Sequence, residues 1–319
     1  MGHDKLRKFA ENETFACLLQ PSAQELLADG YFHLRDHAVK GRWDNFFSDR
    51  VAGSAELPNC TQEKGLVLEL GCGKGEYTIA LAERHPERNY IGVDIKGARL
   101  WKGAKYATEH RLPNVAFLRT RVEFITAFFA PGEVSEVWLT FSDPQYRSEN
   151  SRLCSPLFLE RYRSFLRPGG VVHLKTDSRF LHEYARAVCA VNGLRVLACT
   201  TDLYGGGISP EPPASLKSLS DFADSKVPGP GRSAGADLAS LKCGLPSEVK
   251  DVQTFYERLF LEQGYPITYL SFVIDHDGPY VSPRDPEDFD TEAWRAAEGP
   301  RLLFGHDSAE TRRQKLKNR

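Results

Sequence analysis

Apolar and polar residues follow two different periods between positions 65 and 203. Short runs rich in Val, Ile, Leu and Phe predict buried strands at 65–70, 89–95, 114–118, 135–141, 171–175 and 194–200. The stretches between them carry apolar residues at helical spacing and predict helices at 76–85, 97–110, 122–129, 155–166 and 178–193. Strands that alternate with helices over short connections are typical of an α/β protein with a doubly wound, mostly parallel sheet.

This alternation stops at residue 205. Residues 205–249 contain seven glycines and six prolines, and such a composition predicts a flexible insertion rather than a domain. The pattern then resumes with one helix at 248–264 and a seventh strand at 267–274. The predicted fold is therefore a seven-stranded Rossmann-like sheet.

The chain around this sheet divides into three parts. Residues 1–64 form a mixed N-terminal extension, and residues 65–282 form the α/β domain that the insertion interrupts. Residues 283–319 are polar and end in a basic run, so we expect a solvated, mobile tail.

The overall composition limits which kinds of partner and site the protein can have. The 319 residues carry a net charge of −2, so there is no global basic field, and a site for a polyanion would have to be a local patch. The seven cysteines are odd in number and none has C-x-x-C spacing, which predicts reduced thiols in a cytoplasmic protein and no metal site. No apolar run is long enough to predict a membrane span.

The loop after the first predicted strand carries Gly71, Gly73 and Gly75 behind Glu69. The dinucleotide fingerprint G-x-G-x-x-G needs its third glycine at position 76, which is Glu here, and Glu69 would repel a pyrophosphate. The E-x-G-x-G-x-G form favours a ligand without phosphates. S-adenosylmethionine is such a ligand: Glu69 would balance its positive charge, and the glycines would let the backbone approach its methionine part.

Asp94 ends the second predicted strand, 23 positions after Gly71. A carboxylate there suits the hydroxyl groups of a ribose. The alternative is that Asp94 only caps the N-terminus of the following helix.

Six blocks of the sequence are similar to one known family. They are LVLELGCGKGEYTIALA, YIGVDIKGARLWKGAK, NVAFLRT, EVWLTFSDPQ, LRPGGVVHLKTDS and TFYERLFLEQGYPITYLSF. In this order and spacing they resemble the bacterial tRNA (guanine-N7-)-methyltransferases, over about residues 5–273. The resemblance implies a class I methyltransferase fold, S-adenosylmethionine as methyl donor, and a guanine in the variable loop of tRNA as acceptor.

The resemblance also implies roles for individual residues. Cofactor contacts would fall on Glu69, Gly71, Gly73, Asp94, Arg121, Val122 and Asp143. Asp143 would be the catalytic residue, and substrate contacts would fall on Arg147, Asp177, Thr254 and Glu257. Two positions depart from the family: Arg121 stands where Asp or Asn is usual, and Ser142 replaces a proline in a segment whose following basic run is thinned to RSENSR.

The expected chemistry suits these residues. Guanine N7 carries a lone pair and no proton, so it attacks a sulfonium methyl group directly and the enzyme mainly orients the reactants. A carboxylate beside the purine would stabilise the positive charge that develops there. Each of these residues could instead have a purely structural role: Asp143 as a turn former, Asp177 as a helix cap and Glu257 as a solvated helix residue.

Two other functions stay open at this stage. One is a class I methyltransferase that acts on another RNA, a protein or a small molecule, and the other is a tRNA-binding protein without catalysis. If tRNA is the partner, its phosphates need basic contacts. The candidates are Lys5, Arg7, Lys8, Lys40, Arg42, Arg147 and Arg152.

Overall fold

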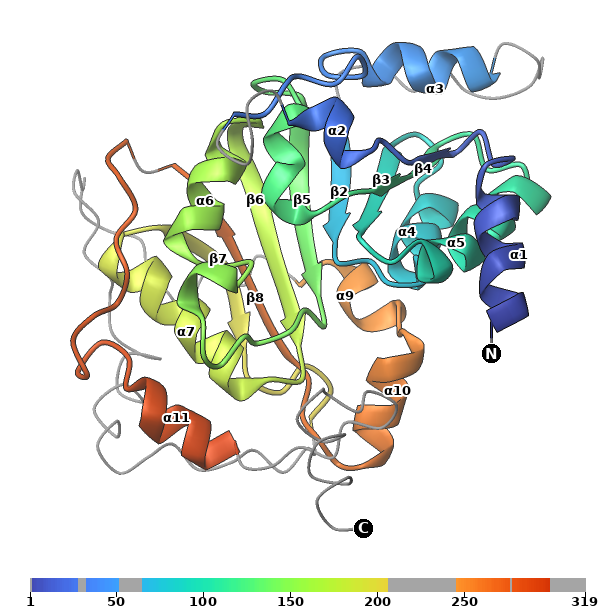
Figure 1. Ribbon diagram of the computed structural model, residues 1–319. Coiled ribbons are helices and arrows are strands. Elements are labelled where there is room, and N and C mark those ends of the chain that lie inside the picture. Colours follow the sequence, from blue (N-terminus) through green and yellow to red (C-terminus); the bar gives the residue numbers. More distant parts are fainter. Residues whose placement is uncertain (1, 28–32, 52–64, 206–244, 276, 299–319) are drawn as a thin grey trace.

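A single mixed sheet forms the centre of the computed structural model, which describes residues 2–27, 33–51, 65–205, 245–275 and 277–298 (Figure 1). Among these residues the sheet has eight strands in the order β1-β4-β3-β2-β5-β6-β8-β7. The strands are β1 (Leu18–Leu19), β2 (Leu66–Leu70), β3 (Asn89–Asp94), β4 (Val115–Arg119), β5 (Val134–Thr140), β6 (Leu166–Thr176), β7 (Arg195–Thr200) and β8 (Thr268–Val273).

The prediction of a doubly wound, mostly parallel sheet is confirmed. Strands β1 to β6 pair in parallel, and β8 runs antiparallel between β6 and β7. All seven predicted strands are present. The eighth strand, β1, comes from the N-terminal extension, and the sequence did not reveal it because two residues are too few to show a period.

Helices cover both faces of the sheet (Figure 1). They are α1 (Gly2–Asn12), α2 (Ala23–Leu26), α3 (Trp43–Val51), α4 (Glu76–Arg84), α5 (Gly97–Glu109), α6 (Pro156–Arg163), α7 (Arg179–Val191), α9 (Ser247–Asp251), α10 (Phe255–Glu262) and α11 (Thr291–Glu298), with short 3-10 helices η2 (Val122–Ala127) and η3 (Glu149–Ser151).

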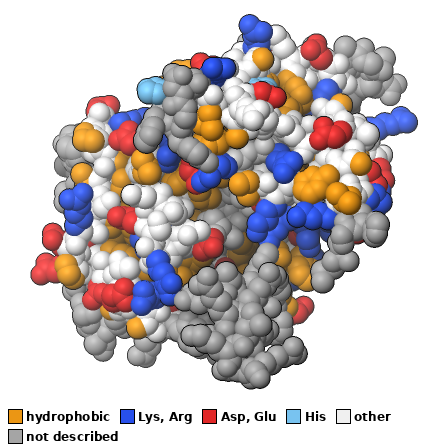
Figure 2. All heavy atoms as spheres, viewed as in Figure 1, with side chains coloured by type: hydrophobic (Ala, Val, Ile, Leu, Met, Phe, Trp, Pro, Cys, Tyr) orange, Lys and Arg blue, Asp and Glu red, His pale blue; other side chains and the backbone are white. Residues whose placement is uncertain are grey.

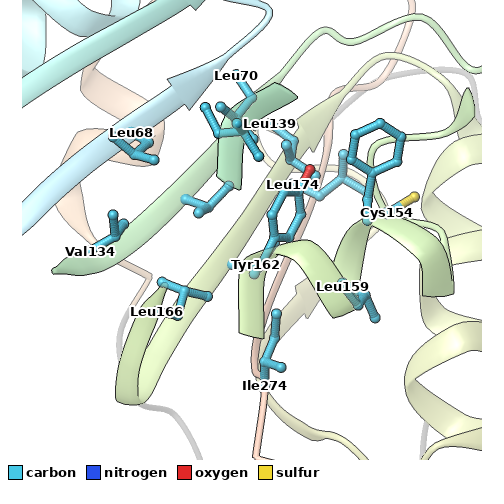
Figure 3. Close-up of a cluster of buried hydrophobic side chains, with 14 of the residues drawn as sticks. Leu68, Leu70, Val134, Leu139, Cys154, Leu159, Tyr162, Leu166, Leu174 and Ile274 are labelled. Carbon is cyan, nitrogen blue, oxygen red and sulfur yellow. The ribbon is translucent and has the colours of Figure 1, made fainter. Parts of the chain in front are cut away.

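Successive strand residues point to opposite faces and so build two cores. Leu66 and Leu68 of β2 belong to the core under α6 and α7, whereas Val67 between them belongs to the core under α4 and α5. Figure 3 shows part of the first core, where Leu68, Val134, Leu139 and Leu174 of the strands meet Leu159 and Tyr162 of α6.

In the second core, two glycines let helices α4 and α5 approach β4 closely. A Cβ atom on Gly75 would lie 2.5 Å from the ring of Phe117, and one on Gly103 would lie 2.6 Å from the same ring. The third glycine of the loop is therefore needed for packing against Phe117.

The N-terminal extension is part of this domain. The side chain of Asn12 donates to the carbonyl of Gly97 at 3.0 Å, and the indole of Trp101 on α5 donates to Glu11 at 2.6 Å. Trp43 is fully buried and donates to the carbonyl of Phe128 at 2.9 Å. Helix α1 thus packs on α5, and the region around Trp43 joins the first core.

Two expectations for the C-terminal part were wrong. The stretch 248–264 is not one helix, because Thr254 forms a capping box that begins α10 as a separate helix. The tail is not solvated over 289–298, because Phe289 and Trp294 are buried and α11 packs on α7. The insertion lies outside the described residues over 206–244.

Candidate active site

The predicted site residues gather at the carboxyl edge of the sheet, where the strand order reverses. The chain leaves β2 towards β3 and β4 on one side, while β5 and β6 lie on the other. Doubly wound sheets bind ligands in the crevice at such a switch point. Here the loops after β2, β3, β4, β5 and β6 all end at this edge. Because β8 is antiparallel, α10 also reaches the edge just before Thr268 pairs with Thr176.

The buried side chain of Glu69 connects the elements that meet at the switch point. Its carboxylate accepts from the backbone N–H of Thr78 at 2.8 Å and from the hydroxyl groups of Thr78 and Thr140. Glu69 is 4% exposed, and this burial raises its pKa to about 7 although the threonine hydrogen bonds oppose the change. Glu69 therefore links β2, α4 and β5, and its predicted direct contact with a cofactor stays a prediction.

The glycine loop turns sharply over the end of β3. Gly71 and Cys72 both donate to the carbonyl of Val93, at 2.8 and 3.0 Å. Gly71 and Gly73 have φ values of 80° and 59°, in the left-handed region that favours glycine, and a Cβ atom on either would meet nothing within 4 Å. The loop backbone at these two positions therefore faces open space that a ligand can fill.

Asp94 fixes this loop in place. One carboxylate oxygen accepts from the N–H of Gly73 at 3.0 Å, and the other accepts from the N–H of Lys96 at 2.7 Å. The N-cap residue of α5 is Lys96, so the alternative reading of Asp94 as that cap is wrong. Each oxygen of Asp94 keeps acceptor capacity for a further donor.

Arg121 and Val122 follow β4 at the next position along the edge. Arg121 is the N-cap residue of η2, and its guanidinium donates to Glu123 at 3.2 Å and lies over the ring of Phe124. Its side chain thus runs along η2, which leaves the backbone of the Arg121–Val122 pair as the part that could meet a cofactor.

Asp143 follows β5 in a strained turn. Its carboxylate is exposed and accepts from the N–H of Gln145 at 2.9 Å. Phe141 and Gln145 have φ values of 51° and 49°, which are unusual for residues other than glycine. Such strain concentrates at functional sites. Asp143 therefore has the turn-forming role that was the structural alternative, and it also presents a carboxylate at the switch point.

Asp177 follows β6 and is half-buried. The N-cap residue of α7 is Ser178, whose hydroxyl accepts from Leu181 at 3.1 Å, so Asp177 is not that cap. Ser178 also donates to Glu298 of α11 at 3.1 Å, and the hydroxyl of Tyr146 donates to the same carboxylate oxygen at 3.0 Å. The C-terminal helix thus connects the loops that carry Asp143 and Asp177.

Thr254 and Glu257 lie at the start of α10, beside the glycine loop. They form a reciprocal capping box, in which Thr254 accepts from the N–H of Glu257 at 3.2 Å. The neighbouring Phe255 donates to Glu76 of α4 at 2.8 Å, and Lys74 of the glycine loop lies over the Phe255 ring. The expected substrate contact by Thr254 and Glu257 stays a prediction.

Glu257 is not a solvated helix residue, so this structural alternative is wrong. It is fully buried and forms an ion pair of 2.7 Å with Lys175, which is equally buried at the end of β6. Lys175 also donates to the carbonyl of Val252 at 2.9 Å, and the hydroxyl of Tyr204 donates to Glu257 at 2.7 Å. Burial lowers the pKa of Lys175, although the carboxylate of Glu257 opposes this.

Lys175, Tyr146 and Glu298 received no role from the sequence. A lysine at the end of the predicted buried strand VVHLK was a signal that its charge needs a buried partner. Nothing near Glu298 in the sequence pointed to the loops after β5 and β6, because those contacts are made only by the folded chain.

Several predicted phosphate contacts are used within the protein. Arg7 pairs with Asp4 and Glu11, and Lys8 also pairs with Asp4. Figure 2 shows Lys and Arg side chains scattered over the visible face, with several lying together right of its centre. Of the predicted cations, Arg147 is exposed and follows Asp143 in the same loop.

The residues present fit S-adenosylmethionine. The open backbone at Gly71 and Gly73 gives the methionine part room, and the free acceptor capacity of Asp94 suits ribose hydroxyls. Among the described residues, no group of three or more His, Cys, Asp or Glu side chains could hold a metal ion. In the same part of the chain, no helix has the length and apolar character to cross a membrane.

Comparison with known proteins gives the family. A family model described as "Putative methyltransferase" matches residues 63–205. A tRNA (guanine-N(7)-)-methyltransferase of Christiangramia forsetii is 41% identical over 85% of this chain and 98% of its own length. One of Bacteroides fragilis is 36% identical over 89% of this chain and 90% of its own length.

Among solved structures, the 16S rRNA methyltransferase KamB is 20% identical, with 68% of this chain and 94% of that chain covered and a TM-score of 0.39. The relatives from Christiangramia and Bacteroides are aligned over nearly their whole length, and their similarity extends well beyond the glycine loop. The chain therefore belongs to the tRNA (guanine-N(7)-)-methyltransferase family.

Proposed function

We propose that this protein transfers a methyl group from S-adenosylmethionine to N7 of a guanine in the variable loop of tRNA. The observation that carries the proposal is the position of Asp143, whose exposed carboxylate follows β5 directly beside the glycine loop that follows β2. The family relationship supports tRNA as the acceptor, and such a substrate implies work in the cytoplasm.

The cofactor, when bound, supplies an electrophilic methyl group on a sulfonium. The backbone at Gly71 and Gly73 would give it room, and Asp94 would accept from its ribose hydroxyl groups. The lone pair of guanine N7 forms the new N–C bond as the S–C bond breaks, so the positive charge moves from sulfur to the purine. No proton has to leave before this attack, and orientation supplies much of the rate.

Asp143 provides the electrostatic part of the mechanism. Its carboxylate faces the purine as that ring becomes cationic, so its interaction with the ring is stronger in the transition state than before reaction. Asp177, on the neighbouring strand end, is suited to accept from guanine N1–H and the N2 amino group. Adenine has no donor in either place, so this contact selects guanine.

Arg147 would hold the RNA backbone beside Asp143. Thr254 and Glu257 would act at the other side of the crevice, where α10 meets the glycine loop. Because Glu257 is buried in its ion pair, its contribution to substrate binding would come through the position of the α10 N-terminus.

Methyl transfer to tRNA tests this proposal. The protein is incubated with bulk tRNA and S-adenosylmethionine labelled in the methyl group, and the tRNA is then digested to nucleosides. We expect the label in 7-methylguanosine. Label in another nucleoside would assign a different methyltransferase reaction, and tRNA binding without any transfer would leave only a binding protein.

A further inference from the structure

A cavity of about 460 Å³ lies beside the acceptor side of the site. Its wall includes Tyr146 and Arg147 from the loop after Asp143, and Arg284 and Arg295 from the C-terminal segment. The volume is in the range of pockets that hold small ligands. Since Tyr146 and Arg147 belong to the same loop as Asp143, a molecule in the cavity adjoins whatever lies against that carboxylate.

A buried cation forms another part of the cavity wall. Arg152 lines the cavity and is 3% exposed. Its guanidinium donates to the carbonyls of Pro144 at 3.3 Å and Tyr146 at 3.4 Å, and it lies 4.4 Å from the centre of the Tyr184 ring. Within the described ranges, no carboxylate is close enough to form an ion pair with Arg152. A buried charge without a counter-ion is costly, so an anion in the cavity is favoured.

The acidic side chains around the cavity are already engaged. Glu149 accepts from the hydroxyl of Tyr184 at 2.8 Å. Glu292 pairs with Arg295 at 3.0 Å on the exposed surface of α11, where the two side chains are 72% and 45% exposed. Four arginines and two carboxylates line the cavity, so the net charge of its lining side chains is positive.

The backbone of α11, which carries Arg295, is anchored beside the cavity. Trp294 is buried next to Arg295, and the guanidinium of Arg179 on α7 lies over the Trp294 ring. At the end of the same helix, Glu298 accepts from Tyr146 and Ser178. The two walls of the cavity are thus connected through α11, which carries Arg295.

We propose that this cavity binds a phosphate of the tRNA backbone next to the target guanosine, through Arg152, Arg147, Arg284 and Arg295 in its wall. The planar guanidinium group matches a phosphate with paired hydrogen bonds. This inference rests on the proposed function. In this proposal, arginines of the C-terminal segment take the role of the basic run that this chain lacks after Arg147.

Steady-state methylation of a tRNA transcript at several salt concentrations tests the cavity. Arg284→Gln and Arg295→Gln should each raise KM for tRNA about tenfold. Each should also reduce the slope of log KM against log salt by about 0.7–1, as expected for one lost phosphate contact. KM for S-adenosylmethionine should not change. Glu292→Gln should lower KM for tRNA, because it releases Arg295 from its ion pair.

Arg195→Gln is the matched control. Arg195 is exposed and lies at the start of β7, at the opposite edge of the sheet, so the same charge change there should leave KM and the salt slope as in the unaltered protein. Wild-type KM and slope in both arginine variants would overturn the cavity proposal alone. A loss of turnover without a change in KM would also overturn it, by assigning the arginines to loop geometry. An unaltered protein that transfers no methyl group to tRNA would instead overturn the proposed function.

Discussion

Lys175 and Glu257 form an ion pair of 2.7 Å in which neither side chain is exposed. The pair joins the end of β6 to the first turn of α10, so two elements far apart in the sequence meet behind the glycine loop. Tyr77 of α4 adds its ring beside the lysine, with the ammonium 5.3 Å from the ring centre. The ion pair therefore fixes where the N-terminus of α10 lies at the candidate active site.

Glu257→Gln should destabilise the protein by about 3–5 kcal/mol, because it leaves the charge of Lys175 buried and unpaired. Glutamine at this place still closes the capping box, so the loss does not come from the helix end. Chemical denaturation measures it. The double variant Lys175→Met with Glu257→Gln should recover most of the loss, whereas Thr254→Ala, which removes only the cap, should cost about 1 kcal/mol. A Glu257→Gln protein as stable as the unaltered one would contradict the role given to the pair.

Glu69 should make the protein less stable as pH rises from about 4.5 to 7. Burial raises its pKa from 4.5 to about 7, so in this window the folded protein holds a proton that the unfolded chain has released. Across the whole window the effect on the free energy of unfolding is about 3 kcal/mol. Other carboxylates titrate too, and so the useful quantity is the difference between Glu69→Gln and the unaltered protein, since the amide does not titrate.

That difference is measured by denaturation at pH 5, 6, 7 and 8 without cofactor. The variant should gain stability relative to the unaltered protein as pH rises to 7 and then stay level. A difference independent of pH would mean that Glu69 is ionised throughout and that its burial is better compensated than its threonine contacts indicate.

Asp143→Asn should slow the chemical step while largely sparing the binding of both ligands. The amide keeps the size of the side chain and still accepts from Gln145, but it no longer offers a negative charge to the purine. Loss of one such preorganised interaction costs roughly 10²–10³ in rate. Single-turnover kinetics with saturating tRNA and cofactor isolate this step. Turnover at the unaltered rate would reduce Asp143 to a turn residue and make Asp177 the better candidate.

The strands and the glycine loop were predictable because their signals are local. Each buried strand contains a short run of mostly apolar residues, and the glycines that follow Leu70 mark a sharp turn after the first of them. Asp94 was found for the same reason, since its position at a strand end follows from counting along the chain. The main errors lay where a polar side chain overrides a period, as when Thr254 starts a new helix inside an apparently continuous one.

The contacts that join distant segments could not be predicted in this way. Glu298 lies 152 positions from Tyr146, and the sequence around it is polar enough to suggest a solvated tail. The burial of Trp294 against the folded domain, together with the hydrogen bonds of Glu298, brings α11 to the site. The partner of Lys175 was hidden for the same reason, because a single charged residue shows that a partner is needed but not which one.

Replacement of the reacting atom tests the central claim most directly. A tRNA can be prepared in which the guanines of the variable loop are 7-deazaguanine, which has a C–H group in place of N7 and keeps the same Watson–Crick edge. The account predicts that this tRNA binds like the unmodified transcript and accepts no methyl group, while the unmodified transcript is methylated. Methyl transfer to the deaza tRNA at a comparable rate would contradict it, because the acceptor could not then be guanine N7.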